Sequence, residues 1–531
     1  MSGVPGTRPV PPPAGGHPDG VNALPTAPLS MWLDVERAEP RAALADDVRC
    51  EVAVVGAGIA GLTTALLLAR QGVDVRVLES RRVGDGCTGH TNAKCTVLHG
   101  SSFSQLRETH GADVTRRYAQ ANLAGLSWLA DTAADADCAW ETRSAVSWAS
   151  GGSDAVDSME SEVRAARDAG VRGARLTADV GLPLDDVAAA VLLPDQGQVD
   201  PYRYLLHLAA ELEAAGGRLH EHTRARSVSW RGLPTVLTAD GPRVVADRVV
   251  VATQVPFLDR GLFFARLEPY RSYQLAVRLP DAPPEVMAIS TGSPTRSYRD
   301  APSPQGGRVA LVGGDGHKTG QGPSTWTHVR DLAAWAERVL GSGSGDSTVV
   351  EHRWSAQDYE SPDDLPYVGR LLPTDDRVLV VTGLRKWGMT NGTAAALALA
   401  PMARGEAPPS WATVYDPARV TLQESATSFI SSNANVAKEM VLGWVTPDRG
   451  RHRELAEGEG EVVRNGLVKV GRSKIDGVER QVSAVCPHLG GILSWNDADR
   501  SWDCPLHGSR FAPDGTMLQG PAVGDLPCST V

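Results

Sequence analysis

Apolar and polar positions near the start of the chain change period within a short distance. Residues 50–72, "CEVAVVGAGIAGLTTALLLARQG", begin with a short apolar run and continue into a segment whose apolar positions have helical periodicity. Gly56, Gly58 and Gly61 lie between the two in a Gly-x-Gly-x-x-Gly spacing. A second apolar run, "VDVRVLE", ends at Glu79. The pattern predicts a strand, a glycine loop, a helix and a second strand.

This arrangement is typical of dinucleotide binding. Gly56 permits a tight turn, Gly58 lets a pyrophosphate approach the backbone, and Gly61 allows close packing of the helix on the strand. Glu79 then stands where it can accept hydrogen bonds from ribose hydroxyls. The segment "VGGDGHKTG" at 312–320 lacks this spacing, so we find no second unit of the kind that pyridine-nucleotide flavoenzymes carry. The sequence therefore predicts one bound dinucleotide.

A different pattern lies near the end of the chain. The stretch "CPHLGGILSWNDADRSWDCPLHGS" contains one Cys and one His in each of two short loops, namely Cys486, His488, Cys504 and His507. A structural zinc site is one interpretation. Zinc fingers, however, usually group like ligands, whereas here each loop supplies both kinds. The Pro and Gly residues of the loops also favour backbone amides that point towards an anionic cluster.

Composition limits the classes of partner. Hydrophobic residues make up 42% and charged residues 22% of 531 residues, which is typical of a globular protein of two or three domains. The net charge of −11 argues against nucleic acid as a partner. The longest apolar run, 394–403, is too short to span a membrane. The Pro- and Gly-rich start lacks the features of a secretory signal, so we expect a disordered arm and a cytoplasmic location.

The C-terminal quartet resembles the Rieske iron–sulfur domain, over about residues 450–531. The resemblance implies a [2Fe–2S] cluster in which Cys486 and Cys504 hold one iron and His488 and His507 the other. Ser509 matches a serine that donates a hydrogen bond to a cluster sulfur, whereas Phe511 replaces a tyrosine donor of high-potential members. We therefore expect a potential below that of the respiratory Rieske proteins.

The remainder, about 48–425, resembles the D-amino-acid-oxidase-like (DAO) family of FAD-dependent oxidoreductases. The segments that carry the resemblance are the glycine loop, "LESRRVGDGCTGHTNAK", a strand placing an adenine contact near Ala225, "RVVVATQ", and "GLRKWGMTNG". The N-terminus of the helix that follows the last segment would face the flavin ring, where reduction builds negative charge. The resemblance implies FAD contacts at Gly56, Gly58, Gly61, Glu79, Ser80, Thr88, His90, Asn92, Ala93, Ala225, Ala252, Gly383, Gly388, Met389, Thr390 and Asn391.

Two of these loop positions are candidate catalytic residues. His90 aligns with a histidine that bonds covalently to flavin in related dimethylglycine and sarcosine dehydrogenases, and a noncovalent polar contact is the alternative. Lys94 could face the flavin and polarise it, or be an ordinary loop lysine. Candidates for the substrate pocket are Tyr270, Arg271, Tyr273 and Gln357, although aromatic residues at such spacing are more often part of a core.

These patterns predict an α/β FAD-binding domain of Rossmann type with a mixed-sheet substrate subdomain, followed by a small all-β Rieske domain. We expect a disordered arm at 1–31, the FAD-dependent domain at 32–425 with its substrate layer at about 101–190 and 261–360, a linker at 426–449 and the Rieske domain at 450–531. The expected activity is a dehydrogenase of an amine, amino acid or related small molecule that passes electrons through its own cluster to an external one-electron carrier. The alternatives are an electron-transfer or reductase component without such a substrate, and an oxidase that uses oxygen.

Overall fold

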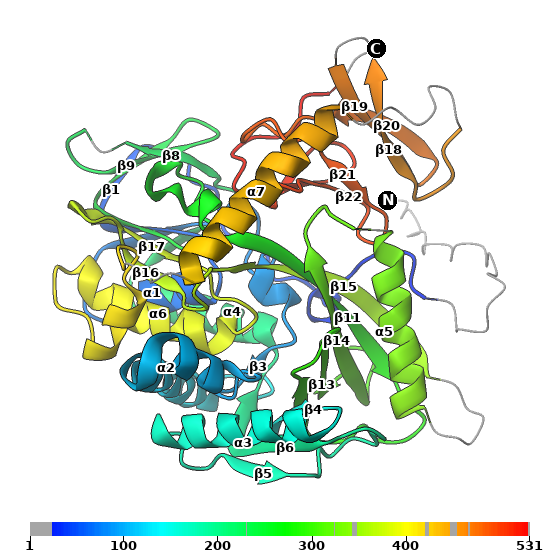
Figure 1. Cartoon of the computed structure of the whole chain (residues 1–531). Helices are drawn as coiled ribbons and strands as arrows, with labels where there is room; N and C mark the ends of the chain where they lie inside the picture. The colour runs from blue at the N-terminus through cyan, green and yellow to red at the C-terminus, as the bar shows by residue number, and fades with distance from the viewer. Residues whose placement is uncertain are drawn as a thin grey trace, which may run out of the picture.

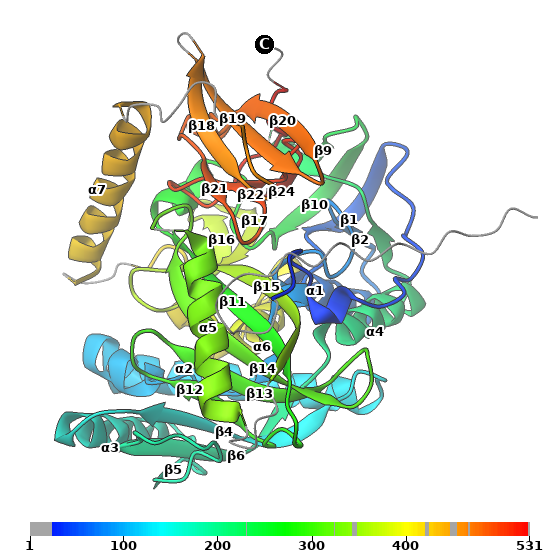
Figure 2. The ribbon, with the colours of Figure 1, turned by 90° about the vertical axis from the view of Figure 1, so that its right-hand side faces the viewer.

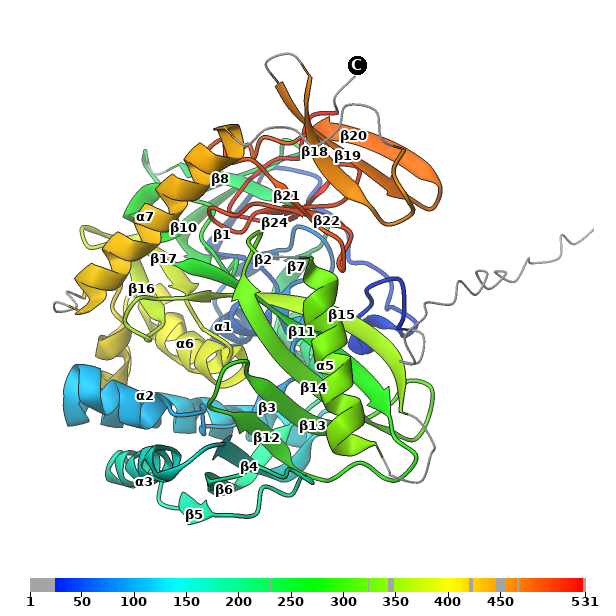
Figure 3. The same ribbon diagram turned by 45° about the vertical axis from the view of Figure 1, so that its right-hand side comes forward.

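The computed structural model describes residues 24–229, 231–322, 324–341, 348–419, 424–445, 454–465 and 468–528. We call 24–419 the N-terminal module and 454–528 the C-terminal module. The N-terminal module contains two large sheets with helices packed on them, and the C-terminal module lies above both (Figure 1). In the views of Figures 2 and 3, β21 and β22 face the N-terminal module, while β18, β19 and β20 lie farther out.

The first sheet has the order β16-β17-β10-β1-β2-β7, with β8 and β9 attached beside β10. The strands β17, β10, β1, β2 and β7 pair in parallel, while β16 is antiparallel to β17. Its strands are β1 (Val48–Val55), β2 (Val75–Leu78), β7 (Arg218–His220), β8 (Ala225–Ser229), β9 (Thr235–Thr238), β10 (Arg243–Val251), β16 (Tyr367–Leu372) and β17 (Asp375–Thr382).

Helices cover this sheet because its central strands are apolar on both faces, as in other parallel sheets. Helix α1 (Ile59–Ala69) is buried along almost its whole length and contacts both α4 (Pro201–Ala214) and α6 (Gly388–Ala403). The long helix α2 (Ser102–Ala134) packs on α6, and α3 (Ser153–Asp168) packs on α2. Asp200 caps α4 by accepting hydrogen bonds from the backbone N–H groups of Tyr202 and Arg203.

The second sheet is mixed and has the order β15-β11-β14-β13-β12-β4-β6-β3, with β5 beside β6. Helix α5 (Thr325–Leu340) packs on β14 and β11. The strands are β3 (Lys94–Cys95), β4 (Glu141–Ala149), β5 (Arg175–Thr177), β6 (Ala189–Gln198), β11 (Glu268–Arg278), β12 (Met287–Ser290), β13 (Arg296–Pro302), β14 (Arg308–Lys318) and β15 (Val349–Glu360). The 3₁₀ turns are η1 (Met31–Leu33), η2 (Cys87–His90), η3 (Arg260–Ala265) and η4 (Ser410–Tyr415).

The C-terminal module consists of two small antiparallel sheets. One contains β18 (Gly460–Asn465), β19 (Val468–Ile475) and β20 (Val478–Ser483). The other contains β21 (Ser494–Asn496), β22 (Ser501–Asp503), β23 (Arg510–Phe511) and β24 (Met517–Gln519). Helix α7 (Glu424–Val445) precedes the module and occupies most of the expected linker.

Buried polar groups join the two modules. Asp497 accepts hydrogen bonds from the N–H groups of Thr325 and Trp326, at 2.9 and 3.3 Å, and so caps the first turn of α5. Arg271 of β11 forms an ion pair with Asp499 at 3.0 Å, and its Nε lies 3.6 Å from Asp503. The Arg271 contacts are buried and the Asp497 contacts half-buried, and together they fix the C-terminal module on the N-terminal one.

The expected fold class, with a mixed second sheet and a small all-β C-terminal module, is confirmed. The expected arm falls mainly on residues 1–23, which lie outside the described residues. Residues 24–31 differ from the expectation, because the N–H of Leu29 bonds to the carbonyl of Arg353 and the Ser30 hydroxyl to the carbonyl of Gly89. Those contacts give this segment a defined path over the N-terminal module.

Candidate functional site

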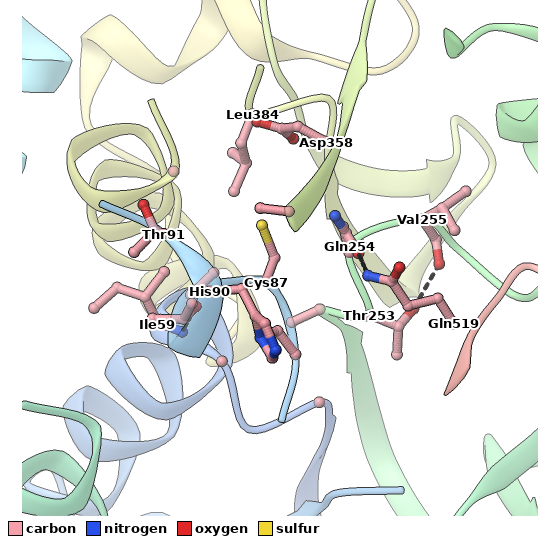
Figure 4. Close-up of a pocket in the computed structure, with 18 of the residues that line it drawn as sticks. Ile59, Cys87, His90, Thr91, Thr253, Gln254, Val255, Asp358, Leu384 and Gln519 are labelled. Atoms are coloured by element: carbon pink, nitrogen blue, oxygen red, sulfur yellow. Dashed lines mark hydrogen bonds between the residues drawn. The ribbon is translucent and has the colours of Figure 1, made fainter. Parts of the chain in front are cut away.

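A cavity of about 290 Å³ lies where the two sheets and the C-terminal module meet (Figure 4). One part of its wall comes from the glycine loop and the ends of β1, β2 and β10, and a second part comes from the second sheet. Residues 517–520 and 522–523 of the C-terminal module complete the wall. The cavity is therefore shared between the two modules.

The glycine loop has the close contacts that its spacing predicted. Gly56 has φ +104°, and a Cβ there would lie 2.5 Å from the carbonyl oxygen of Ala252. A Cβ on Gly61 would lie 1.9 Å from the carbonyl oxygen of Gly56. Glycine is therefore required at both positions, and the backbone stays open to a pyrophosphate at the N-terminus of α1.

Glu79 closes the nucleotide end of the cavity. Its carboxylate accepts hydrogen bonds from the N–H of Ala57 at 2.9 Å and from the N–H of Arg81 at 3.0 Å. These bonds orient a carboxylate that retains further acceptor capacity for hydroxyl groups. The wall and the glycine loop thus fit the dinucleotide that the sequence predicted.

The structure places most of the predicted cofactor residues on this wall. Those that line the cavity are Gly56, Gly58, Glu79, Ser80, Thr88, His90, Asn92, Ala225, Ala252, Gly388 and Met389. The others are buried elsewhere in the same elements and do not line it, namely Gly61, Ala93, Gly383, Thr390 and Asn391. Their contacts indicate packing: the Thr390 hydroxyl donates to the carbonyl of Thr96, and the Asn391 amide donates to the carbonyl of Leu384.

His90 lies on the wall at the end of η2. Its Nδ1 is 2.8 Å from the carbonyl oxygen of Gly86, so Nδ1–H donates and Nε2 remains available to the cavity. Burial lowers the pKa of His90 to about 4, which keeps the ring neutral at physiological pH.

Lys94 also lines the cavity. Its ammonium nitrogen donates to the carbonyl of Ala288 at 2.7 Å and to the Ser297 hydroxyl at 2.6 Å. Burial, with a smaller effect from the positive charge of Arg299, lowers the pKa of Lys94 to about 7. The amine can therefore hold or release a proton near neutral pH.

Strands β11 and β15 present alternate residues to the cavity. Ser272, Gln274, Ala356 and Asp358 line it, whereas the predicted pocket residues Tyr270, Arg271, Tyr273 and Gln357 do not. Arg271 and Gln357 instead bond to each other at 2.9 Å, and Tyr273 contacts His317. The sequence identified the correct strands, but Arg271, Tyr273 and Gln357 lie on the face away from the cavity, because polar residues line both sides where a second module packs on the sheet.

Asp358 and Lys386 are cavity residues that the sequence reasoning missed. Asp358 is half-buried at the cavity wall, and burial raises its pKa well above the usual range of a carboxyl group. Lys386 lies in the predicted glycine loop "GLRKWGMTNG" and is exposed at the cavity wall. The alternation of β15 and the position of Lys386 in a predicted cofactor loop were the signals that could have found them.

The cysteine and histidine quartet is brought together by two similar turns. The N–H of Cys486 bonds to the carbonyl of Gly491, and that of Cys504 bonds to the carbonyl of Ser509. The rings of His488 and His507 lie 5.1 Å apart. The spacing of the sequence motif therefore predicted a real spatial group.

The chemistry of this group fits a binuclear cluster. A hydrogen bond with Cys504 outweighs burial and lowers the pKa of Cys486 to about 7. The two thiols therefore lie next to each other, as the two thiolate ligands of one iron would. Nδ1 of His507 is buried without a hydrogen-bond partner, as a ligating nitrogen would be. Among the described residues, no three His, Cys, Asp or Glu side chains are arranged to hold a single metal ion. A [2Fe–2S] cluster, however, requires only two protein ligands for each iron.

The N-terminal module covers the histidines of this group. Phe264 of η3 packs edge-on against His488 and His507, with ring centroids 5.2 Å from each. Asp259 lies 3.5 Å from Nε2 of His488. The hydroxyl of Ser509 accepts a hydrogen bond from the N–H of Ala522 at 3.0 Å and also bonds to Cys486, while Phe511 is fully buried.

Comparison with known proteins agrees with both sites. The family model described as "FAD dependent oxidoreductase" (DAO) matches residues 51–402, and the model of the Rieske [2Fe-2S] domain matches residues 449–530. The chain belongs to the DAO family of FAD-dependent oxidoreductases. Its cofactors are therefore FAD and a Rieske [2Fe–2S] cluster.

One relative is similar over nearly the whole chain, and two solved structures share the fold of about 70% of it. YhfW of Bacillus subtilis, whose name describes a Rieske 2Fe-2S iron-sulfur protein, is 31% identical over 504 residues, which cover 94% of this chain and 97% of YhfW. Glycine oxidase from Geobacillus kaustophilus matches with a TM-score of 0.58 and 18% identity, over 70% of this chain and 99% of that one. L-proline dehydrogenase from P. horikoshii matches with a TM-score of 0.56 and 18% identity, over 70% and 98%.

No described helix combines the length and the apolar character that a membrane span requires.

Proposed function

We propose that this DAO-family oxidoreductase dehydrogenates an amine, an amino acid or a related small molecule and passes the electrons through its Rieske cluster to an external one-electron carrier. One observation carries the proposal: residues 517–520 of the C-terminal module, which lie close after the cluster ligand His507, line the same cavity as the glycine loop. A cluster so close to the flavin cavity needs no mobile carrier between the two.

The residues of the chain support the substrate class. When bound, FAD accepts a hydride from a carbon next to nitrogen. Lys94, whose pKa is about 7, is placed to take up the proton of a substrate amine. Lys386 adds a positive charge at the wall, which suits a substrate with a carboxylate. The named activities of glycine oxidase and L-proline dehydrogenase are compatible with this class.

The test is anaerobic reduction by a panel of amines and amino acids, recorded by absorbance. We expect one class of these compounds to bleach the flavin absorbance first and the cluster absorbance afterwards. The Cys504→Ser protein should keep its FAD, lose its iron, still bleach with substrate and fail to reduce a one-electron acceptor. Reduction of the cluster by a protein donor before the flavin would refute the dehydrogenase and support the reductase alternative. Zinc in place of iron would refute the cluster.

A further inference from the structure

Strand β15 separates the cavity from the cluster loops. Ala356 and Asp358 line the cavity, whereas Gln357 and Tyr359 point to the opposite side, towards the C-terminal module. Successive side chains of a strand point to opposite faces, so the two sides are only one residue apart. The strand is thus a wall one residue thick between the two sites.

Tyr359 joins this wall to two cluster loops. Its hydroxyl donates to the carbonyl of His507 at 3.0 Å, and the carbonyl of Gly520 lies at 3.3 Å. The hydroxyl also accepts a hydrogen bond from the Gln357 amide at 3.0 Å. The side chain is 2% exposed, and burial raises its pKa, so the phenol keeps its proton.

Gln357 adds a second bond to the same loop. Its amide nitrogen donates to the carbonyl of Gly508 at 2.8 Å, while its oxygen accepts from Arg271 at 2.9 Å and from Thr319 at 3.0 Å. The buried amide therefore has a partner on each side, and its orientation is fixed.

Close packing explains how the loop reaches the strand. Gly508 has φ +77°, and a Cβ there would lie 2.6 Å from Cβ of Pro269 and 2.9 Å from the Tyr359 hydroxyl oxygen. A larger residue would push the loop that carries His507 away from β15. Glycine in the left-handed region is required for this contact.

We propose that Tyr359 is the positioning residue that holds the His507 loop against β15 and forms the electronic contact between the flavin cavity and the cluster. The inference rests on the proposed function. Each transfer moves one electron from reduced flavin to the oxidised cluster, and two transfers, each followed by loss of an electron to the external carrier, balance one two-electron oxidation of substrate.

Within the protein, the path for an electron from the cavity wall to the cluster ligand consists of covalent bonds and one hydrogen bond. It runs from the Asp358 backbone at the cavity wall through the Tyr359 side chain and across one hydrogen bond to the carbonyl of the ligand residue His507. A second connection joins Gln519 to Gln254 at 3.1 Å, but Gln519 lies on the loop without a ligand. The Tyr359 contact is the more direct of these two.

The test uses the full chain with FAD and iron bound and compares Tyr359→Phe with Tyr298→Phe. The control is matched, because Tyr298 is equally buried and its hydroxyl donates to one backbone carbonyl, that of Pro284, at 2.9 Å. Flash photoreduction of the flavin starts the transfer without substrate. Absorbance then gives the rate of cluster reduction, and electron paramagnetic resonance gives the spectrum and potential of the cluster.

We expect Tyr359→Phe to slow flavin-to-cluster transfer by about tenfold, equivalent to about 1.4 kcal/mol in the barrier, and to shift the resonance spectrum. Tyr298→Phe should change neither the transfer rate nor the resonance spectrum. Gly508→Ala, which displaces the same loop, should also slow the transfer in protein that retains its iron. An unchanged rate and spectrum in Tyr359→Phe would overturn this inference alone. Failure of the unaltered protein to pass electrons from flavin to cluster would overturn the proposed function with it.

Discussion

Replacing Arg271 with Met should uncouple the C-terminal module from the N-terminal one. The Arg271 side chain is fully buried and lies between two acidic residues of the C-terminal module, Asp499 and Asp503, which are 5% and 2% exposed. Removing the guanidinium leaves both carboxylates buried with Arg510 as their remaining cation. Breaking a buried ion pair in this way usually costs about 3–5 kcal/mol.

The pKa of Asp503 gives a second measure of the same interaction. Burial raises the pKa of Asp503, but Arg510 and Arg271 outweigh it and hold it at about 2. Relative to the ordinary value of 3.8, this difference corresponds to roughly 2 kcal/mol, to which hydrogen bonds from Asn496 and Ser501 contribute as well as the two arginines. This contribution of Asp503 to stability is present above about pH 4 and is lost as the pH falls through 2. The reason is that, as the pH falls, the Asp503 carboxylate binds a proton in the unfolded chain before it does so in the folded one.

The assay is urea denaturation followed by the visible absorbance of the cluster, which reports on the C-terminal module. A loss of about 3 kcal/mol should lower the midpoint by at least 1 M, since small domains have slopes of about 1–3 kcal/mol/M. Arg243→Met is the control, because its ion pair with Asp47 is exposed to solvent and should contribute little to stability. A midpoint for Arg271→Met within the error of that control would refute the reasoning.

Three further predictions concern the cavity. The rate of substrate-dependent flavin bleaching should rise with pH and level off above about 7 as Lys94 loses its proton, and Lys94→Met should remove this dependence; an unchanged pH profile would contradict the assignment. Gly61→Ala should lose most of its bound FAD because the new Cβ would meet the carbonyl of Gly56, whereas Gly292→Ala has free space and should keep it, as the FAD content of purified protein will show. Acid-precipitated protein should stay yellow if His90 bonds to the flavin through its free Nε2, and His90→Ala should release the colour; a colourless pellet from the unaltered protein excludes the bond.

The features that the sequence predicted correctly are those that depend on the spacing of residues within one short segment. The glycine loop and the two Cys–His pairs each lie within a short segment, so the residue types and intervals were sufficient to predict the turn, the cradle and the ligand group. The choice of face on β11 and β15 depends on what packs behind the strands. Arg271 and Gln357 face residues of the C-terminal module that follow 228 and 151 residues later in the chain. No local pattern of polarity distinguishes that buried interface from a substrate pocket.

The remaining differences have the same origin. Asp358 was missed because a carboxyl group in a strand usually faces solvent, and its burial arises only when the cavity wall, β15 and the second module are assembled. Residues 24–31 have the composition of a loose arm, yet their backbone groups find partners in β15, and the Ser30 hydroxyl bonds to a carbonyl of η2. In both cases the structure depends on partners that lie far away in the sequence, which no short segment of the sequence reveals.

The thickness of β15 limits which genetic changes the protein can tolerate. From Ala356 to Tyr359, each side chain serves either the cavity or the cluster loops, so a substitution there affects one of the two. Loss or gain of a single residue would instead exchange the two faces, so that Tyr359 would turn to the cavity and Asp358 to the His507 loop. In a library of variants, β15 should therefore tolerate single replacements better than insertions or deletions, and its length should be a stronger mark of this two-cofactor arrangement than any one of its residues.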